Sequence, residues 1–257
     1  MKRYGIIGNP LGHSYSEKYF TELFVREGIE ATYGVYQIDS ISSAIPLLAS
    51  LEGMNVTYPY KEAIIPHLTE MDVAAEEIGA VNVVKRGKGY NTDWIGFRDS
   101  VRPLLREHDR RVLLLGTGGV SKAIQYALQE MGLEYTVVSR LGGEAAKRLQ
   151  DKAREKRLEE KGAERLRYQE VDKEVMQAHT VIVNCTPLGM HPYDKELPAI
   201  PYEYLTEDHL LYDCIYNPAK TLFLQMGEEH GCRIKNGLEM LFMQADEAWR
   251  IWSGQQL

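Results

Sequence analysis

A short apolar segment that leads into a glycine-rich turn constrains the fold of this chain more than any other feature. Residues 112–115 (VLLL) are all apolar, which is typical of a strand buried on both faces of a parallel sheet. Residues 116–121 (GTGGVS) follow directly, and the pattern then predicts a helix to about Met131, which Gly132 stops. A buried strand, a glycine turn and a helix in this order indicate a βα unit of a sheet with helices on its faces.

The alternation of strand and helix continues on both sides of this unit. Further buried strands are expected at residues 135–139, 180–185 and 210–214. Such strands, separated by helices, imply right-handed βαβ units and a Rossmann-like, doubly wound parallel sheet. The first third predicts strands at 4–8, 32–38 and 54–57, helices at 16–27 (capped by Ser16) and 40–50, a helix that opens near Tyr60, and a hairpin of residues 80–85 and 89–92.

A charged stretch at residues 107–111 (EHDRR), after a linking helix expected at 94–107, marks the boundary between two α/β domains. The C-terminal segment has apolar residues at helical spacing and is expected to return to the first domain. We therefore expect a smaller α/β domain over residues 1–97 and 238–257, a Rossmann-like domain over 98–237, and the active site in the cleft between them. Residues 144–167, dense in Lys, Arg and Glu, are interpreted as a solvated helical insertion.

Composition excludes several classes of function. The net charge of −7 argues against nucleic acid or an anionic membrane surface as the main partner. The three cysteines, Cys185, Cys214 and Cys232, are widely spaced and form neither a metal-binding pattern nor a disulfide framework, which favours a reducing compartment. The N-terminal apolar run is too short for a signal peptide, and no segment approaches the roughly 20 apolar residues of a membrane span. We expect a cytoplasmic, metal-free monomer or homodimer.

The glycine turn partly matches the G-x-G-x-x-G fingerprint of dinucleotide-binding folds, with Ser121 in place of the third glycine. Gly116 would permit the tight turn and Gly118 the close approach of backbone to ligand, while the N-terminus of the helix attracts a pyrophosphate. The context of a buried strand and a helix favours a nucleotide site. A tight loop without a ligand is the alternative interpretation.

The end of the second strand in this domain bears on the choice between NAD and NADP. An acidic residue there would bind the ribose 2′-hydroxyl of NAD, but the strand ends in Ser139 and Arg140. An arginine can pair with a 2′-phosphate and stack on adenine, and Ser139 could add a hydrogen bond. NADP is therefore favoured, although Arg140 could also be an ordinary surface arginine.

Lys61 and Asp93 lie upstream of this nucleotide fingerprint, in the first domain. An amine can supply or remove a proton at a carbinol or ketone oxygen, so the combination suggests proton transfer coupled to hydride transfer. Taken alone, Lys61 would more often be a solvated lysine at the start of a helix.

The motifs together resemble the shikimate dehydrogenase family over nearly the whole chain. They occur in the order of that family: GNPLGHSYS at 8–16, NVTYPYK at 55–61, GAVN at 79–82, NTD at 91–93, the glycine turn, NCTPLGM at 184–190, DCIYNP at 213–218, and NG at 236–237 followed by Met240, Leu241 and Gln244. The resemblance implies reversible NADPH-linked reduction of 3-dehydroshikimate to shikimate in aromatic amino acid biosynthesis.

The resemblance also implies roles for individual residues. Lys61 would be the proton donor, and the acceptor in the reverse direction, while Asp93 orients Lys61 and binds a ring hydroxyl. Ser14 and Ser16 would bind the substrate carboxylate (an S-x-S pair alone would more often cap a helix), with Tyr216 near that carboxylate and His13 supporting the loop. The hydroxyl contacts would be Thr57, Asn82, Asp93 and Gln244. The cofactor contacts would be Gly116, Thr117, Gly118, Gly119, Val120, Ser139 and Arg140, with Thr186, Ile215 and Gly237 beside the nicotinamide.

Some positions depart from the family pattern. Glu17 replaces a proline that commonly follows the S-x-S pair, and Ser139 and Leu141 flank Arg140 where the family often has Asn and Thr. The nearest alternative is a quinate/shikimate dehydrogenase with NAD preference, although Thr57 could crowd the extra hydroxyl of quinate. Further alternatives are a non-catalytic dinucleotide-sensing protein of the same fold and a folate-dependent dehydrogenase of similar architecture, for which the S-x-S pair would have no purpose.

Overall fold

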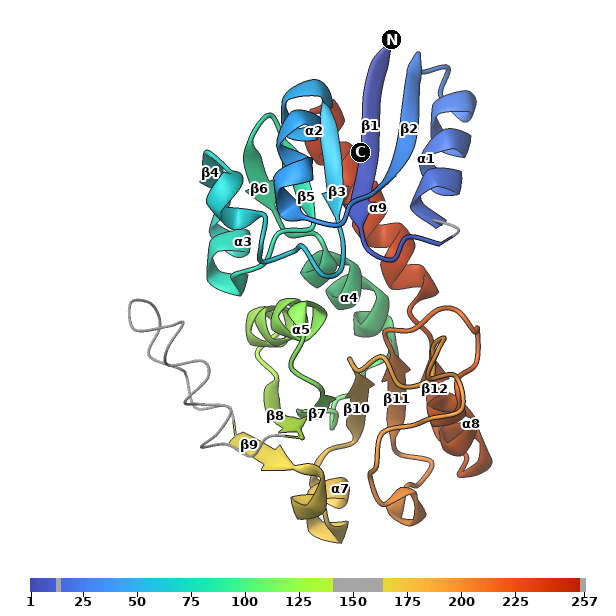
Figure 1. Cartoon of the computed structure of the whole chain (residues 1–257). Helices are drawn as coiled ribbons and strands as arrows, with labels where there is room; N and C mark the ends of the chain where they lie inside the picture. Colours follow the sequence, from blue (N-terminus) through green and yellow to red (C-terminus); the bar gives the residue numbers. More distant parts are fainter. Residues whose placement is uncertain (13–14, 141–163, 255–257) are drawn as a thin grey trace. The chain divides into compact units, whose positions relative to one another are not determined.

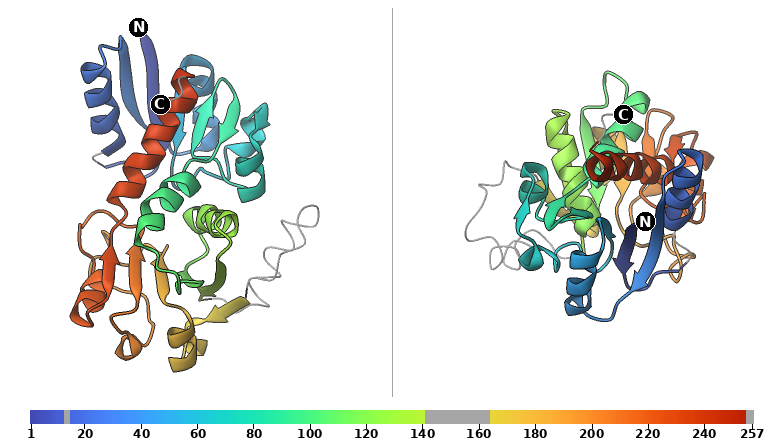
Figure 2. Two further views of the ribbon diagram at one scale, coloured as in Figure 1. Left: turned by 180° about the vertical axis from the view of Figure 1, so that it is seen from behind. Right: turned by 90° about the horizontal axis from the view of Figure 1, so that it is seen from above.

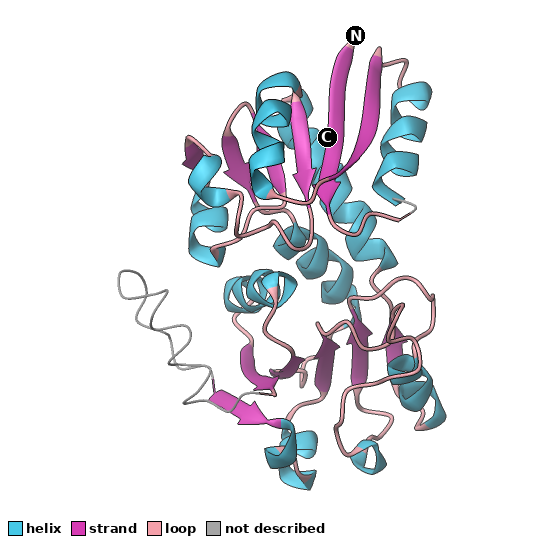
Figure 3. Ribbon diagram, viewed as in Figure 1, coloured by secondary structure: helices cyan, strands magenta, loops and turns pink. Residues whose placement is uncertain are grey.

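The computed structural model describes residues 1–12, 15–140 and 164–254. The chain splits into two compact units. Unit 1 contains Met1–Asp99, Lys122–Tyr126 and Met240–Leu257, and unit 2 contains Ser100–Ser121 and Ala127–Glu239. Within the described residues each unit is built on a six-stranded sheet flanked by helices (Figures 1 and 3).

The sheet of unit 1 is mixed, with the strand order β2-β1-β3-β5-β6-β4. Strand β1 pairs in parallel with both β2 and β3, whereas β5 runs antiparallel to β3 and to β6. The strands are β1 (Lys2–Gly8), β2 (Ala31–Gln37), β3 (Gly53–Val56), β4 (Glu70–Met71), β5 (Val83–Lys85) and β6 (Lys88–Tyr90). The expected hairpin is confirmed as β5 and β6, and its turn consists of Arg86 and Gly87, both with positive φ.

Alternate side chains of β1 divide the core of unit 1 between the two faces of its sheet. Tyr4 and Ile6 face α1 (Tyr15–Arg26) and α9 (Leu238–Ser253), where Trp252 stacks on Tyr4 with ring centroids 5.1 Å apart. Ile7 points to the other face, which is covered by η1 (Ile41–Ala44), α2 (Ile45–Ser50), η2 (Ile65–His67) and α3 (Val73–Ile78). Seen from behind, α9 crosses its face of the sheet (Figure 2), so the C-terminal helix packs on the first unit as expected.

Unit 2 contains the doubly wound parallel sheet that the sequence predicts. Its strand order is β12-β11-β10-β7-β8-β9, and every pair is parallel. The chain moves outward in one direction from β7 and then in the other from β10, so the order reverses between β7 and β10. The strands are β7 (Arg111–Leu115), β8 (Glu134–Ser139), β9 (Glu164–Arg167), β10 (Val181–Asn184), β11 (Leu210–Asp213) and β12 (Arg233–Lys235).

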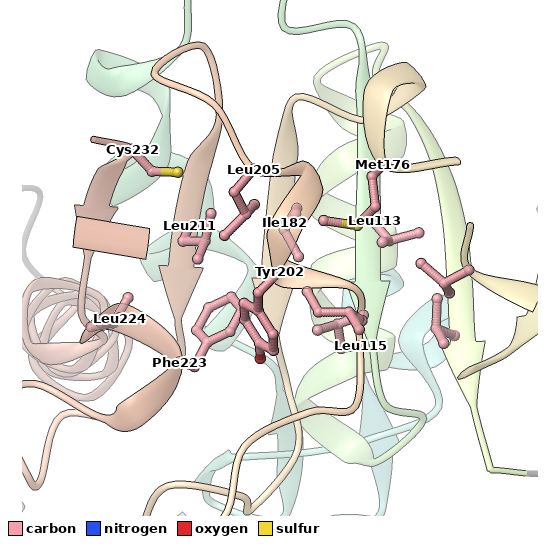
Figure 4. Packing of buried hydrophobic residues seen from close by; sticks show 13 residues of the cluster. Leu113, Leu115, Met176, Ile182, Tyr202, Leu205, Leu211, Phe223, Leu224 and Cys232 are labelled. Atoms are coloured by element: carbon pink, nitrogen blue, oxygen red, sulfur yellow. The ribbon is translucent and has the colours of Figure 1, made fainter. Parts of the chain in front are cut away.

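Apolar side chains on one face of this second sheet form its core. Leu113, Ile182 and Leu211 come from three neighbouring strands, and Phe223 and Tyr202 pack against them (Figure 4). The remaining helices of the described residues are α4 (Asp93–Val101), η3 (Arg102–Leu104), α5 (Gly119–Glu130), η4 (Tyr168–Glu170), α7 (Lys173–Ala178), η5 (Tyr202–Tyr204) and α8 (Leu222–Glu229). Of these, α4 belongs to unit 1 as far as Asp99, and Lys122–Tyr126 of α5 is also part of unit 1. None of the helices in the described part of the chain is long and apolar enough to cross a membrane.

Prolines explain why one expected helix is absent and another is shorter than expected. Residues 58–64 form turns, followed by η2, instead of a helix that opens near Tyr60. Pro59 and Pro66 bracket that stretch, and a proline lacks the N–H donor and disfavours helical backbone at the preceding residue. The linking helix expected at 94–107 is α4, which ends at Val101, just before η3 with its Pro103.

Two further expectations about helices are wrong. Helix α1 begins at Tyr15, so Ser16 lies within its first turn and is not its cap, because a cap residue precedes the first helical residue. The charged insertion was expected to be helical to residue 167, but Glu164–Arg167 is strand β9, which pairs in parallel with β8. Strand β8 supplies hydrogen-bond partners for the backbone of residues 164–167, and the charge pattern of the sequence does not encode this pairing. The rest of that segment lies outside the described residues.

Candidate active site

Lys61 sits on a turn that is anchored at both of its ends. The Tyr60 hydroxyl donates to the carbonyl of Ile38 over 2.6 Å, and the Ile64 side chain is fully buried. The backbone N–H of Val81 donates to the carbonyl of Lys61 itself over 2.8 Å. These contacts fix the backbone of Lys61 next to the segment that carries Asn82, so the lysine side chain starts from a defined position.

The side chains of Lys61 and Asp93 form an ion pair within unit 1. Lys61 Nζ lies 2.7 Å from Asp93 Oδ2, and only 19% and 9% of the two side chains are exposed. Asp93 is the first residue of α4, where the helix N-terminus favours a negative charge, and its N–H is bound by Asn91 Oδ1 at 3.0 Å. The ion pair is therefore held in place by the backbone around Lys61 and by the N-terminus of α4, and it is partly shielded from water.

Asn82 connects this ion pair to a second polar side chain. It is 3% exposed, and its Nδ2 donates to Asp93 Oδ1 over 2.9 Å and lies 3.3 Å from Gln244 Oε1. Its Oδ1 accepts from the N–H of Thr92 over 2.7 Å. The hydrogen-bonding groups of this amide are therefore all used within the protein, which holds the side chain in one orientation.

Helices α4 and α9 approach closely at Gly96, which brings Gln244 into this cluster. A Cβ at Gly96 would lie 2.5 Å from the carbonyl oxygen of Met240 and 3.1 Å from the Cβ of Gln244, so a larger residue would push α9 away. Gln244 is buried, and its Nε2 donates to the carbonyl of Leu241 over 2.8 Å. The structure therefore brings together Lys61, Asp93, Asn82 and Gln244 of the expected substrate residues.

The other expected substrate residues of this unit lie near the ends of strands. Thr57 follows β3 directly and is half-buried. Ser16 is half-buried in the first turn of α1 and is hydrogen-bonded to Tyr33, whose own hydroxyl donates to Asn55 Oδ1 over 2.6 Å. Burial holds the pKa of Tyr33 well above its usual range, so this hydroxyl stays protonated. Ser14 and His13 lie outside the described residues.

The glycine turn of unit 2 has the conformation that its sequence suggests. Gly116 has φ 106°, and a Cβ there would lie 3.2 Å from the carbonyl of Cys185, so both its backbone and its space require glycine. Gly118 precedes the first residue of α5 and has open space beside it. Ser121, in place of the third glycine, is fully buried and donates to the carbonyl of Gly116 over 2.8 Å. The serine therefore closes the loop with a hydrogen bond.

The remaining loop residues leave the helix N-terminus accessible. Thr117 and Gly118 are exposed, and Gly119 and Val120 are half-buried. The first N–H groups of a helix have no partner within the helix and can bind an anion. This arrangement can hold a phosphate of a dinucleotide.

Two buried polar residues shape the loops that follow β10 and β11. Asn184 and Asp213 are fully buried, and Asn184 Nδ2 donates to Asp213 Oδ1 over 3.1 Å. Asn184 Oδ1 accepts from both the N–H and the hydroxyl of Thr186, at 3.0 and 2.7 Å. Asp213 accepts from the N–H of Ile215 at 3.0 Å and from the hydroxyl of Thr221 at 2.5 Å. Burial raises the pKa of Asp213 to about 6, although these hydrogen bonds act in the opposite direction.

Sequence reasoning did not single out Asn184 and Asp213 as site residues. Asn184 ends β10 and Asp213 ends β11, and they lie within the NCTPLGM and DCIYNP motifs, respectively. A polar residue at the end of an apolar strand is the sequence pattern that could have indicated them. In unit 1 the buried side chains of Asn55, Tyr33 and Thr92 were missed in the same way.

The remaining candidate residues lie at or just after the C-terminal ends of strands, along one edge of the parallel sheet. Ser139 ends β8 and is half-buried, and Arg140 beside it is exposed. The N–H of Gly237 donates to the carbonyl of Ile215 over 3.0 Å, and a Cβ at Gly237 would overlap the carbonyl of Cys214. Tyr216 is half-buried next to Ile215. In doubly wound sheets this edge, at the point where the strand order reverses, is where ligands bind.

The described ranges contain no group of three or more His, Cys, Asp or Glu side chains arranged to hold a metal ion. Two other features of the described residues stand out: an amine–carboxylate pair with its amides in unit 1, and the glycine loop at the N-terminus of α5 in unit 2. These residue types serve acid–base chemistry and dinucleotide binding, respectively.

A family model, related sequences and solved structures all show similarity of this chain to one enzyme family. Residues 6–84 match the family model of the shikimate dehydrogenase substrate binding domain. The shikimate dehydrogenase (NADP⁺) of Carboxydothermus hydrogenoformans is 39% identical, over 97% of this chain and 91% of that protein. The crystal structure of shikimate dehydrogenase from Aquifex aeolicus is 35% identical with a TM-score of 0.84, covering 100% of this chain and 94% of that one. The crystal structure of shikimate 5-dehydrogenase from Thermus thermophilus, in complex with NADP(H) and shikimate, is 28% identical with a TM-score of 0.84. That match covers 99% of this chain and 94% of the Thermus thermophilus chain.

Proposed function

Because this chain belongs to the shikimate dehydrogenase family, we propose that it catalyses the reversible NADPH-dependent reduction of 3-dehydroshikimate to shikimate. The observation that carries the proposal is the shielded ion pair of Lys61 and Asp93, which Asn82 ties to Gln244. An acid–base pair embedded in neutral hydrogen-bonding groups suits a small polyhydroxylated substrate. The pathway that uses the product is aromatic amino acid biosynthesis.

Lys61 moves the proton in this mechanism. When the substrate carbonyl is reduced, the Lys61 ammonium gives a proton to its oxygen, and in the reverse direction the neutral amine takes the hydroxyl proton. Bound NADPH supplies the hydride. Asp93, 2.7 Å from Nζ, fixes the direction of the amine, and Asn82 fixes Asp93 through its second carboxylate oxygen.

Short polar side chains would orient the ring of the substrate. Asp93, Asn82, Gln244 and Thr57 are proposed to contact its hydroxyls, with Ser14, Ser16 and Tyr216 toward its carboxylate. The proximity of Asn82 and Gln244 to the Lys61–Asp93 pair supports this assignment, because hydrogen bonds hold these side chains in one cluster.

The glycine loop and the sheet edge of unit 2 are proposed to bind NADP(H). Gly116, Thr117, Gly118, Gly119 and Val120 would hold the pyrophosphate, where the open space beside Gly118 fits close approach of a ligand. Exposed Arg140 and Ser139 would hold the 2′-phosphate. Thr186, Ile215 and Gly237 would line the nicotinamide, in loops that Asn184 and Asp213 hold rigid.

A cytoplasmic location and a monomer or homodimer complete the proposal. The three widely spaced cysteines of the sequence do not form the pattern of a disulfide framework, which supports a reducing compartment.

Steady-state kinetics test the function directly. Purified protein should reduce NADP with shikimate as donor, followed by the absorbance of the reduced nicotinamide, and should prefer shikimate and NADP over quinate and NAD. A higher kcat/KM with quinate and NAD would identify the alternative enzyme. Binding of NADPH without turnover of either acid would identify a non-catalytic dinucleotide-sensing protein.

A further inference from the structure

Two cysteines face each other just past the ends of two neighbouring strands of unit 2, and neither belongs to the proposed substrate or cofactor residues. The β10–β11 ladder pairs Asn184 with Asp213, and Cys185 and Cys214 are the residues that directly follow these two strand ends. Their side chains therefore point to the same face of the sheet. The two Sγ atoms are 3.7 Å apart, which is van der Waals contact.

The backbone around the two thiols already has the spacing that a disulfide needs. The ladder continues past both strands, because the N–H of Cys214 donates to the carbonyl of Asn184 over 3.0 Å. Paired strands lie about 4.8 Å apart, and disulfides bridge Cα atoms separated by about 4.4–6.8 Å. A bond between Cys185 and Cys214 thus needs a rotation of side chains rather than a rearrangement of the sheet.

The two thiols differ in access to solvent. Cys185 is 8% exposed, whereas Cys214 is half-buried and can be reached by a small oxidant. The third cysteine, Cys232, is packed in the core of unit 2, and its thiol donates to the carbonyl of Thr206 over 3.2 Å. Burial raises the pKa of Cys232 to about 11, so this thiol is inert and provides an internal control.

The backbone that carries the pair is in tight contact with two glycines proposed to bind the cofactor. A Cβ at Gly116 would lie 3.2 Å from the carbonyl of Cys185, and one at Gly237 would overlap the carbonyl of Cys214. Because there is no free space at either position, a small shift of either cysteine is transmitted to the glycine loop or to Gly237.

We propose that Cys185 and Cys214 are a redox modification site, in which peroxide converts the two thiols to a disulfide that weakens NADP(H) binding. Cys214 attacks one peroxide oxygen, the O–O bond breaks, and a sulfenic acid and one water form. The Cys185 sulfur then attacks the sulfenic sulfur and releases a second water. Two thiols are oxidised by two electrons and one peroxide is reduced to two waters. The effect on binding rests on the proposed function.

Peptide mapping of the unmodified chain tests the chemistry without any reliance on activity. The folded protein is treated with hydrogen peroxide, its remaining thiols are alkylated, and the digest is analysed by mass spectrometry without reductant. We expect a peptide pair that joins Cys185 to Cys214, lighter by two hydrogen atoms and separated by dithiothreitol, with Cys232 alkylated. Cys232→Ala should give the same cross-link and Cys214→Ser none. Alkylation of both Cys185 and Cys214 after peroxide treatment overturns the proposal.

Calorimetric titration with NADPH tests the coupling. The oxidised protein should bind NADPH about tenfold more weakly, an ordinary size for coupling between two sites, and dithiothreitol should restore the affinity. By the same linkage, saturating NADPH should shift the equilibrium between the two thiols and the disulfide, set by a dithiothreitol redox buffer, toward the thiols. A cross-linked protein with unchanged affinity overturns the coupling. A reduced protein that binds no NADPH contradicts the proposed function instead, while the peptide map still decides the cross-link.

Discussion

Lys61 Nζ lies 2.7 Å from Asp93 Oδ2, although 32 positions separate the two residues in the sequence. The contact depends on a turn pinned to the backbone of Val81 and on a helix that begins at Asp93. Because Asn82 holds the second carboxylate oxygen, two side chains from two other segments fix the position of the Lys61 amine. Such pre-positioning is what a proton-transfer group requires.

Removal of the Lys61 amine should abolish most of the turnover. In Lys61→Ala we expect kcat to fall about 10²- to 10⁴-fold, the usual contribution of a positioned acid–base group, while shikimate still binds in calorimetry. Lys85→Ala is the matched control, because Lys85 is another half-buried lysine of unit 1 that contacts a backbone carbonyl. Unchanged kcat in Lys61→Ala would remove Lys61 from the mechanism.

Asn82 should act through Asp93 as well as on the substrate. Its amide donates to a carboxylate, and such hydrogen bonds contribute about 1.5–3 kcal/mol, so Asn82→Ala should lower kcat/KM about 10- to 100-fold. Because the orientation of Lys61 is lost together with a ligand contact, we expect kcat to fall and KM to rise. If only KM rises, Asn82 binds substrate without positioning the acid–base pair.

Arg140 should decide the preference between the two cofactors. It is exposed at the end of β8 and is proposed to pair with the 2′-phosphate, which NAD lacks. Arg140→Ala should raise KM for NADP about tenfold or more, in line with a charged hydrogen bond, and leave KM for NAD unchanged. An equal rise for both cofactors would show that Arg140 contacts a part that they share.

Asp213 should make the stability of the protein fall as the pH rises through its folded-state pKa. That pKa is raised from 3.8 to about 6, so between these values the native state binds more protons than the unfolded state. This group then lowers the free energy of unfolding by about 2 kcal/mol between pH 4 and pH 7, since one pKa unit corresponds to about 1.4 kcal/mol and part of the titration lies below pH 4.

Urea unfolding at several pH values tests this prediction with Asp213→Asn. The asparagine does not titrate, so the stability of the variant relative to the unmodified protein should rise with pH over that interval. A stability difference independent of pH would show that the carboxyl of Asp213 has an ordinary pKa.

Gly53 should tolerate no side chain, because β3 and α9 touch there. A Cβ at Gly53 would overlap the indole ring of Trp252, whose Nε1 also donates to the carbonyl of Val84 over 3.1 Å. Gly53→Ala should therefore destabilise the protein by about 1–3 kcal/mol, as overpacking of a core does. Gly12→Ala, where the added carbon meets nothing within 4 Å, is the control for thermal or urea unfolding. Equal stability of the two variants would contradict the close packing of Trp252.

The sequence by itself determined the features that depend on short-range patterns. The apolar run before Gly116 predicted β7, the glycine turn and α5, because burial on both faces of a strand and the need for positive φ at Gly116 are local properties. The repeated strands predicted the doubly wound sheet of unit 2, and the ordered motifs identified the family. Where local signals conflicted, as in the proline-bracketed turn at Lys61, the prediction of a helix was wrong.

Only the tertiary structure decided which distant side chains meet. The sequence contains Asn82, Asp93 and Gln244 as separate residues, and Asn82 meets Gln244 because α4 and α9 approach at Gly96. In the same way, strand register alone sets Cys185 against Cys214 and Asn184 against Asp213. Hydrophobic periodicity fixes which face of an element is buried, whereas the partner of a polar atom depends on how two elements pack, and no local pattern encodes that distance.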